Sequence, residues 1–203
     1  MVTPLTFTGS DGALIAALRE GHPGAAAAFY DQHAAHVRRT LRSVMGLDPD
    51  LPDIMQEVFI RAIDRIGELQ QLDEVRSWLT TIAIFAARAH IRRQSRRRVL
   101  FLFSPDQIRS QHREPPSSEA RFALRETYRI LSQLSPDDRI AFALRFIAGM
   151  TLPAAADAAG TSLATFKRRL ARAEKRFLAM ARVRPQLAHW LEEGTRWSQG
   201  GKR

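Results

Sequence analysis

Between Ser162 and Arg176, hydroxyl and cationic side chains recur at helical spacing and together could bind a polyanion. Ser162 can accept a hydrogen bond from a backbone N–H group of a first helical turn, so it predicts the start of a helix. Apolar residues then recur at spacings of four, three and four, which makes one stripe: Phe166, Leu170, Ala173 and Phe177. The opposite face carries Arg168, Arg172 and Lys175, with Lys167 and Arg169 on its flanks. The candidate reading face of this helix consists of these five residues together with Ser162, Thr165 and Arg176. A helix that is apolar behind and cationic in front suits insertion into a DNA major groove.

A short helix of small residues, opened by Thr151, precedes this one, and Gly160-Thr161-Ser162 makes a tight turn between the two. The pair predicts a helix-turn-helix unit. The alternative interpretation of the same stretch is the solvated basic face of an ordinary bundle helix.

A second cationic segment lies near the middle of the chain, where six arginines fall between Arg88 and Arg98. Cations at a helix C-terminus are favoured by the helix dipole, which explains part of this run. Six arginines exceed what the dipole requires, so the segment predicts contacts with a phosphate backbone.

The charge of the chain is divided unevenly. The 203 residues carry a net charge of +10, with residues 1–87 at −4 and residues 88–203 at +14. This asymmetry indicates two kinds of partner, one of them a polyanion. The absence of cysteine excludes disulfides and thiolate metal sites. No apolar run is long enough to span a bilayer, and no cation precedes Arg19 as in a signal peptide, so we expect a cytoplasmic protein.

Helical periodicity predicts an all-α fold of two small helical bundles joined by a flexible linker. The helices expected in the first bundle contain residues 11–18, 25–45, 53–66 and 74–97, and a polar loop at 67–72 separates the last two. The pattern lapses over residues 98–118, resumes at about Glu119, and includes a helix start at Ser135-Pro136. We therefore expect an N-terminal domain at 10–97, a linker at 98–118, a helix-turn-helix domain at 119–184 and a tail at 185–203.

Three stretches in this order resemble the extracytoplasmic-function (group IV) sigma factors of bacterial RNA polymerase, a group of the sigma-70 family. Asp53-Ile54-Met55-Gln56-Glu57-Val58-Phe59 is similar to the D-x-x-Q-E-V-F helix of that family. Trp78-Leu79, Ile82-Ala83 and the Arg92-Arg93 pair are similar to its W-L-x-x-I-A helix with a basic end. Residues 165–173, TFKRRLARA, are similar to its recognition helix. The chain departs from the family pattern at Phe85, at His90 and over Pro153–Ala155.

The resemblance implies that the first bundle is sigma region 2, which docks on core RNA polymerase and melts the minus-ten element of promoter DNA. Asp53, Gln56 and Glu57 would face the polymerase. Gln70 and Gln71 lie in the loop where the family holds a flipped base. Phosphates of the minus-ten region would meet Arg88, Arg92, Arg93, Arg96 and Arg97. The spacing of Phe59 and Trp78 places both in the core stripe, whereas Phe85 fits the core or a stacking surface.

The second bundle would be sigma region 4, which reads the minus-thirty-five element with the eight residues of the reading face named above. The resemblance also implies an anti-sigma protein as a partner. No pattern for a cofactor, a metal or catalysis is present: His33 and His36 lack further ligands at helical spacing, and transcription chemistry would belong to the polymerase. We also expect Trp190 and Trp197 of the tail to fold back on one of the bundles.

Two other functions fit parts of the sequence. A helix-turn-helix regulator that acts without polymerase explains the C-terminal half but leaves the D-x-x-Q-E-V-F helix without a role. A sigma-like protein that sequesters partners is suggested by the departures at Phe85, His90 and Pro153–Ala155. Transcription assays with added core polymerase distinguish these possibilities.

Overall fold

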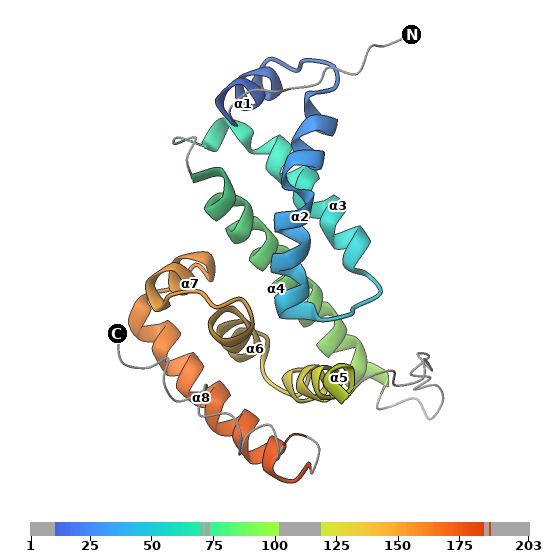
Figure 1. Ribbon diagram of the computed structural model, residues 1–203, viewed down its shortest axis with the longest axis vertical. Coiled ribbons are helices and arrows are strands. Elements are labelled where there is room, and N and C mark those ends of the chain that lie inside the picture. The colour runs from blue at the N-terminus through green and yellow to red at the C-terminus, as the bar shows by residue number, and fades with distance from the viewer. Residues whose placement is uncertain (1–10, 70, 72–73, 102–118, 185–186, 188–203) are drawn as a thin grey trace.

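The computed structural model describes residues 11–69, 71, 74–101, 119–184 and 187, and these residues form an all-α protein (Figure 1). The N-terminal bundle consists of α1 (Asp11–Arg19), α2 (Ala25–Met45), α3 (Leu51–Asp64) and α4 (Val75–Phe101). The C-terminal bundle consists of α5 (Glu119–Leu131), α6 (Pro136–Phe142), α7 (Leu152–Ala158) and α8 (Leu163–Arg182). A π-helical segment, η3 (Ala143–Ile147), continues α6. No strand occurs in the described ranges, so the predicted fold class is confirmed.

The helix starts of the C-terminal bundle follow from their first residues. The side chains of Ser135, Thr151 and Ser162 each accept a hydrogen bond from the backbone N–H group three residues on. Each hydroxyl thereby satisfies one of the donors that an α-helix leaves unpaired at its N-terminus. Pro136 and Pro153 occupy the first turns of α6 and α7, where the missing N–H group costs nothing.

Three boundaries differ from those read off the sequence. Helix α3 begins at Leu51, two residues before the predicted Asp53, because Pro52 is accommodated in its first turn. Helix α3 ends at Asp64, two residues before the predicted Ile66, and the loop after it contains a short 3-10 helix, η1 (Ile66–Glu68). Helix α4 continues to Phe101 and so includes the first residues assigned to the linker. The remaining linker residues, 102–118, and the tail apart from Leu187 lie outside the described part of the chain.

Each bundle buries the apolar stripe that its helices carry. Phe29, Val37, Val58 and Leu79 are fully buried between α2, α3 and α4. In the C-terminal bundle the predicted stripe of α8 is buried, and the rings of Phe142 and Phe177 stack with centroids 4.5 Å apart. Burial of this stripe leaves the cationic face of α8 outward.

The two bundles pack against each other. The apolar core of the N-terminal bundle is continuous with Ile140, Leu144, Ala155 and Phe166 of the C-terminal bundle. Helix α4 contacts α6 and α7, and α2 contacts η3, as the side-by-side ribbons indicate (Figure 1). The sequence predicted the two bundles without predicting their contact. None of the helices in the described ranges has the length and apolarity needed to cross a bilayer.

Candidate nucleic-acid and polymerase interface

The start of α8 presents a compact set of polar side chains. The Ser162 hydroxyl accepts from the Thr165 backbone N–H group at 3.3 Å and donates to Thr165 Oγ1 at 3.0 Å. Arg168 Nη2 donates to the same Thr165 oxygen at 3.2 Å, which positions an exposed guanidinium one turn into the helix. Lys167, Lys175 and Arg176 are exposed along the same helix. These groups lie where a helix inserted in a major groove meets base edges and phosphates.

Arg172, predicted to contact DNA, is held by a carboxylate of its own bundle. Its Nε atom lies 3.1 and 2.9 Å from the two oxygens of Asp138, and its Nη2 atom lies 2.6 Å from Asp138 Oδ1. Asp138 is only 1% exposed. This bidentate pair ties α8 to the first turn of α6, so Arg172 has a structural contact in this conformation.

The neighbouring carboxylate, Asp137, brings three predicted DNA-binding arginines together. Arg88 Nε lies 3.1 Å from Asp137 Oδ1, while Arg92 Nη2 and Arg169 Nη2 lie 3.6 and 3.2 Å from Asp137 Oδ2. We call these three arginines the arginine cluster. Two of them belong to α4 and one to α8, so Asp137 joins helices from both bundles. The sequence showed Asp137 only as an acidic residue in a helical first turn.

Arg88 also bonds to the C-terminal bundle through a second atom and packs against a ring of its own helix, α4. Its Nη2 atom donates to the carbonyl oxygen of Ala159 at 2.7 Å, and its guanidinium lies 5.0 Å from the centre of the Phe85 ring. Burial lowers the pKa of Arg88 below its ordinary value, with the charge of Asp137 acting in the opposite direction. The Asp137 carboxylate therefore compensates a guanidinium that has lost part of its hydration.

Two sets of N-terminal residues predicted to have different partners contact each other. Glu57, expected to face the polymerase, lies 3.6 Å from Arg93, expected to face DNA, and 2.5 Å from Arg61. Asp53 and Gln56 are exposed on the same surface of α3, next to the exposed Ile60. Arg96 is exposed on α4, and Gln71 is exposed before it. Gln70 and the Arg97 side chain lie outside the described part.

The aromatic residues divide as their spacing indicates. Phe59 is buried, and Trp78 is half-buried against the same core, so their assignment to the core is confirmed. Phe85 is 45% exposed, and its ring covers Gly160 in the turn before α8. Phe85 is therefore a contact between the bundles. Trp190 and Trp197 lie outside the described residues.

Side chains of the C-terminal bundle bind the last carbonyl groups of α2. Arg139 Nε donates to Val44 O at 2.9 Å, and Arg139 Nη2 donates to Met45 O at 3.3 Å. The Tyr128 hydroxyl lies 2.7 Å from Arg42 O and 3.0 Å from Ser43 O. A helix leaves its last carbonyls without partners, and a cation is favoured there by the helix dipole. Burial raises the pKa of Tyr128 to about 12, so its hydroxyl remains a donor at neutral pH.

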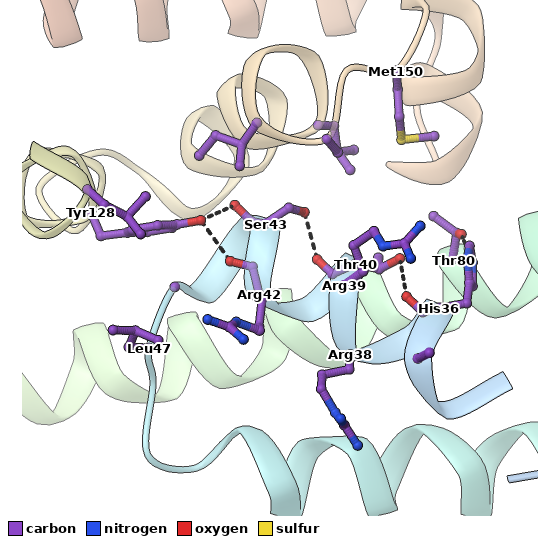
Figure 2. A pocket seen from close by; sticks show the side chains of 16 residues that line it. His36, Arg38, Arg39, Thr40, Arg42, Ser43, Leu47, Thr80, Tyr128 and Met150 are labelled. Atoms are coloured by element: carbon purple, nitrogen blue, oxygen red, sulfur yellow. Dashed lines mark hydrogen bonds between the residues drawn. The ribbon is translucent and has the colours of Figure 1, made fainter. Parts of the chain in front are cut away.

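A cavity of about 720 Å³ lies beside these contacts, between α2 and the C-terminal bundle (Figure 2). Its α2 wall includes His36, Arg39 and Thr40, and its other wall includes Tyr128 and Met150. His36 Nε2 lies 2.9 Å from Oγ1 of Thr80, an α4 residue that also lines the cavity. Burial lowers the pKa of His36, so the ring is neutral at neutral pH.

One group of side chains in the described ranges has metal-ligand chemistry, and it lies apart from the arginine cluster. The ligand atoms of Asp48, Asp50 and His90 are within 4.8 Å of one another. His90 Nε2 lies 3.3 Å from Asp48 Oδ2, and Gln94 Nε2 donates to that oxygen at 3.2 Å. These bonds join the α2–α3 turn to α4, so the polar atoms of the group have partners within the chain. His90, a departure from the family pattern, thus has a structural contact.

Comparison with known families agrees with the two-bundle arrangement. The family model for sigma-70 region 2 matches residues 29–97, and the model for sigma-70 region 4 matches residues 124–177. The ECF RNA polymerase sigma factor SigC of Mycobacterium tuberculosis is 29% identical over 182 residues, which cover 87% of this chain and 96% of SigC.

Two solved structures share the fold. CnrH, solved in complex with the cytosolic domain of CnrY, has a TM-score of 0.56 and 22% identity over 87% of this chain and 99% of its own. RpoE of Bartonella quintana, solved in complex with the anti-sigma factor NepR, has a TM-score of 0.57 and 21% identity over 77% of this chain and 98% of its own. Since models of regions 2 and 4 match in order and together cover more than half of the residues, the chain belongs to the sigma-70 family of RNA polymerase sigma factors, in its extracytoplasmic-function group.

Proposed function

We propose that the two bundles of this alternative sigma factor divide promoter recognition, with the N-terminal bundle docking on core RNA polymerase and opening the minus-ten element. The C-terminal bundle reads the minus-thirty-five element. The supporting observation is that the region 2 model covers α2 to α4, whereas the region 4 model covers the helix-turn-helix formed by α7 and α8. Domain limits of 10–97 and 119–184 fit this division, and the extension of α4 to Phe101 shortens the proposed linker of 98–118 at its start.

The polymerase contact is assigned to the exposed face of α3. Asp53, Gln56 and Glu57 supply carboxylate and amide groups, and Ile60 adds an exposed apolar side chain. An acidic and amide face suits a basic partner, because complementary charge sets the register and rate of docking. The ion pairs of Glu57 with Arg61 and Arg93 hold that carboxylate at the surface.

The DNA contacts are assigned to both cationic helices. Arg88, Arg92, Arg93, Arg96 and Arg97 of α4 follow the phosphate backbone near the minus-ten element, and Gln70 and Gln71 serve the flipped base. On α8, Ser162, Thr165, Arg168, Arg169 and Arg172 are assigned to base edges, and Lys167, Lys175 and Arg176 to phosphates. A base contact by Arg169 or Arg172 requires its release from Asp137 or Asp138. Phosphate contacts position the protein, and base contacts give it sequence preference.

The partners and setting follow from this role. CnrH and RpoE were solved with CnrY and the anti-sigma factor NepR, and we propose an anti-sigma partner for this chain as well. The chain works in the cytoplasm as an initiation factor. It carries no catalytic step or cofactor, and nucleotide addition belongs to the polymerase.

Run-off transcription tests the proposal. The purified chain, added to bacterial core polymerase and genomic DNA of its source, should direct transcripts from a defined set of start sites, and core polymerase alone should not. Retention of DNA binding without any binding to core polymerase would instead identify a helix-turn-helix regulator. Binding to core polymerase without transcripts would identify a sequestering protein.

Arg168→Ala tests the assignment of the reading face. The exposed Arg168 guanidinium is positioned for a base contact, so holoenzyme bearing this change should bind promoter DNA about 1–3 kcal/mol more weakly. Arg182→Ala, which removes the same charge from the exposed last turn of α8, is the matched control. Equal promoter affinities of the two variants in a gel-shift titration would contradict the assignment.

A further inference from the structure

We propose that Asp137 occupies, in the free chain, the arginine cluster that DNA phosphates occupy during initiation, so that the contact between the bundles competes with promoter binding. The inference depends on the proposed function, because it takes Arg88, Arg92 and Arg169 as DNA contacts. It adds an intramolecular ligand for these arginines and a closed state that promoter DNA must displace.

The geometry shows one carboxylate shared by three guanidinium groups. Asp137 Oδ1 lies 3.1 Å from Arg88, and Asp137 Oδ2 lies 3.2 Å from Arg169 and 3.6 Å from Arg92. Guanidinium groups bind carboxylate and phosphate oxygens with the same donors. Three positive charges around one negative charge leave a net positive site, which continues to attract a polyanion.

The position of Asp137 makes its binding and that of DNA mutually exclusive at α4. Asp137 belongs to the first turn of α6, and α6 and α7 lie directly on α4, as the ribbons indicate (Figure 1). A phosphate that reaches Arg88 must replace Asp137 as its partner. The bond from Arg88 to Ala159 O, 2.7 Å long, must also break, since Ala159 belongs to the same C-terminal bundle.

Other contacts between the bundles support a closed state that persists in solution. Arg139 and Tyr128 bind the carbonyl groups at the end of α2, and Phe85 covers Gly160. The shared apolar core adds to these polar contacts. Among the residues that join the bundles, Asp137 forms its ion pairs only with arginines predicted to bind DNA. Removing its charge should therefore weaken the contact between the bundles without disturbing the shared apolar core.

Distance measurements on the free chain test closure. The chain lacks cysteine, so Asp64→Cys on α3 and Ala179→Cys on α8 place two spin labels at exposed sites, one on each bundle. In this labelled background, Asp137→Asn should broaden the distance distribution toward longer values. Asp157→Asn, an equal charge change at an exposed site on α7, is the matched control and should leave the distribution unchanged.

DNA binding by the free chain tests the competition. A fluorescent duplex DNA of random sequence, titrated at low salt, should bind about tenfold more tightly to the Asp137→Asn variant than to the unmodified chain. Asp157→Asn controls for the gain of one positive charge. Asp137→Glu keeps the carboxylate and should restore weak binding. Identical affinities of the two asparagine variants would overturn the competition.

The two measurements separate this inference from the proposed function. Unchanged distances in the Asp137→Asn variant would overturn the role of Asp137 in closure even if run-off transcription succeeded. Failed transcription with a lengthened distance would overturn the function and leave the closure intact. Longer distances without tighter DNA binding would show that Asp137 holds the bundles together without blocking DNA, which also overturns the proposal.

Discussion

Asp138 and Arg172 show how one residue of a predicted DNA-binding set serves the fold. Burial by itself would raise the pKa of Asp138, but hydrogen bonds from Arg172 and Ser135 outweigh burial and hold that pKa below its ordinary value of 3.8. The folded state therefore favours the ionised carboxylate. The spacing of arginines on α8 predicts a DNA contact for Arg172 but gives no sign of its carboxylate partner, because that carboxylate lies 34 residues earlier in the chain and helical periodicity is a local signal.

The pair gives a prediction with a definite pH dependence. Asp138→Asn should lower the free energy of unfolding by about 1–2 kcal/mol at pH 7, because charge-assisted hydrogen bonds between a buried carboxylate and a half-exposed guanidinium are lost. The lowered pKa of Asp138 means that its contribution is fully present above the unfolded value and is lost as the pH falls through the folded value. The difference between variant and unmodified chain should therefore shrink below about pH 4.

Urea denaturation at neutral and acidic pH measures this difference. Asp157→Asn, with an exposed carboxylate on α7, should change the free energy of unfolding little at either pH. A deficit of the Asp138→Asn variant that persists unchanged in acid would show that its cause is packing and not the charge.

At the scale of the element, the helices were predictable and their ends less so. Ser135-Pro136 and Ser162 predicted the starts of α6 and α8, because helix capping is local and depends on residues within one turn. Helix α2 matches its predicted bounds, since glycines lie on both sides of it. The extension of α4 to Phe101 was missed because the apolar string at its end resembles neither an amphipathic helix nor a loop.

The turn between α7 and α8 shows how an element depends on the other bundle. Gly160 has φ +62°, and a Cβ added there would lie 2.8 Å from the Phe85 ring. Gly149 has a similar φ of +71° with no atom within 4 Å of its added Cβ. A side chain at either glycine would therefore strain the backbone, but only a side chain at Gly160 would also collide with Phe85 of the N-terminal bundle.

Gly160→Ala should accordingly cost more stability than Gly149→Ala. We expect about 1 kcal/mol for the backbone conformation at either site and about 1 kcal/mol more at Gly160 for displacement of the Phe85 ring. Thermal unfolding measures both, and the additional change Phe85→Ala should remove the excess at Gly160. An excess that survives Phe85→Ala would mean that the ring is not its cause.

At the scale of the molecule, the two bundles were predictable from the sequence, but the packing of one bundle against the other was not. The arginine run of α4 and the reading face of α8 predict contacts with a polyanion, but charge counts do not reveal which carboxylate lies among these arginines. Tyr128, Arg139 and Phe85 are ordinary members of helical patterns, and their contacts form between residues distant in sequence. Such contacts follow from tertiary packing, which one sequence does not encode in any local signal.

Removing the Tyr128 hydroxyl oxygen tests the contact between the two bundles. Tyr128→Phe removes the bonds to Arg42 O and Ser43 O, and should lower the free energy of unfolding by about 1 kcal/mol. Tyr30→Phe is the control, because Tyr30 is exposed and lies within the N-terminal bundle. Amide hydrogen exchange should accelerate in the Tyr128 variant at the end of α2, and equal exchange in both variants would contradict a cap supplied by the other bundle.

The capping of α2 by Tyr128 and Arg139 also bears on how the protein is made. These side chains lie between 85 and 95 residues further along the chain than the carbonyl oxygens they bind. A ribosome releases the chain from its N-terminus, and contacts of large sequence separation form late. The nascent N-terminal bundle therefore emerges with the last turn of α2 hydrated and frayed, and that turn is completed only after α6 has left the exit tunnel.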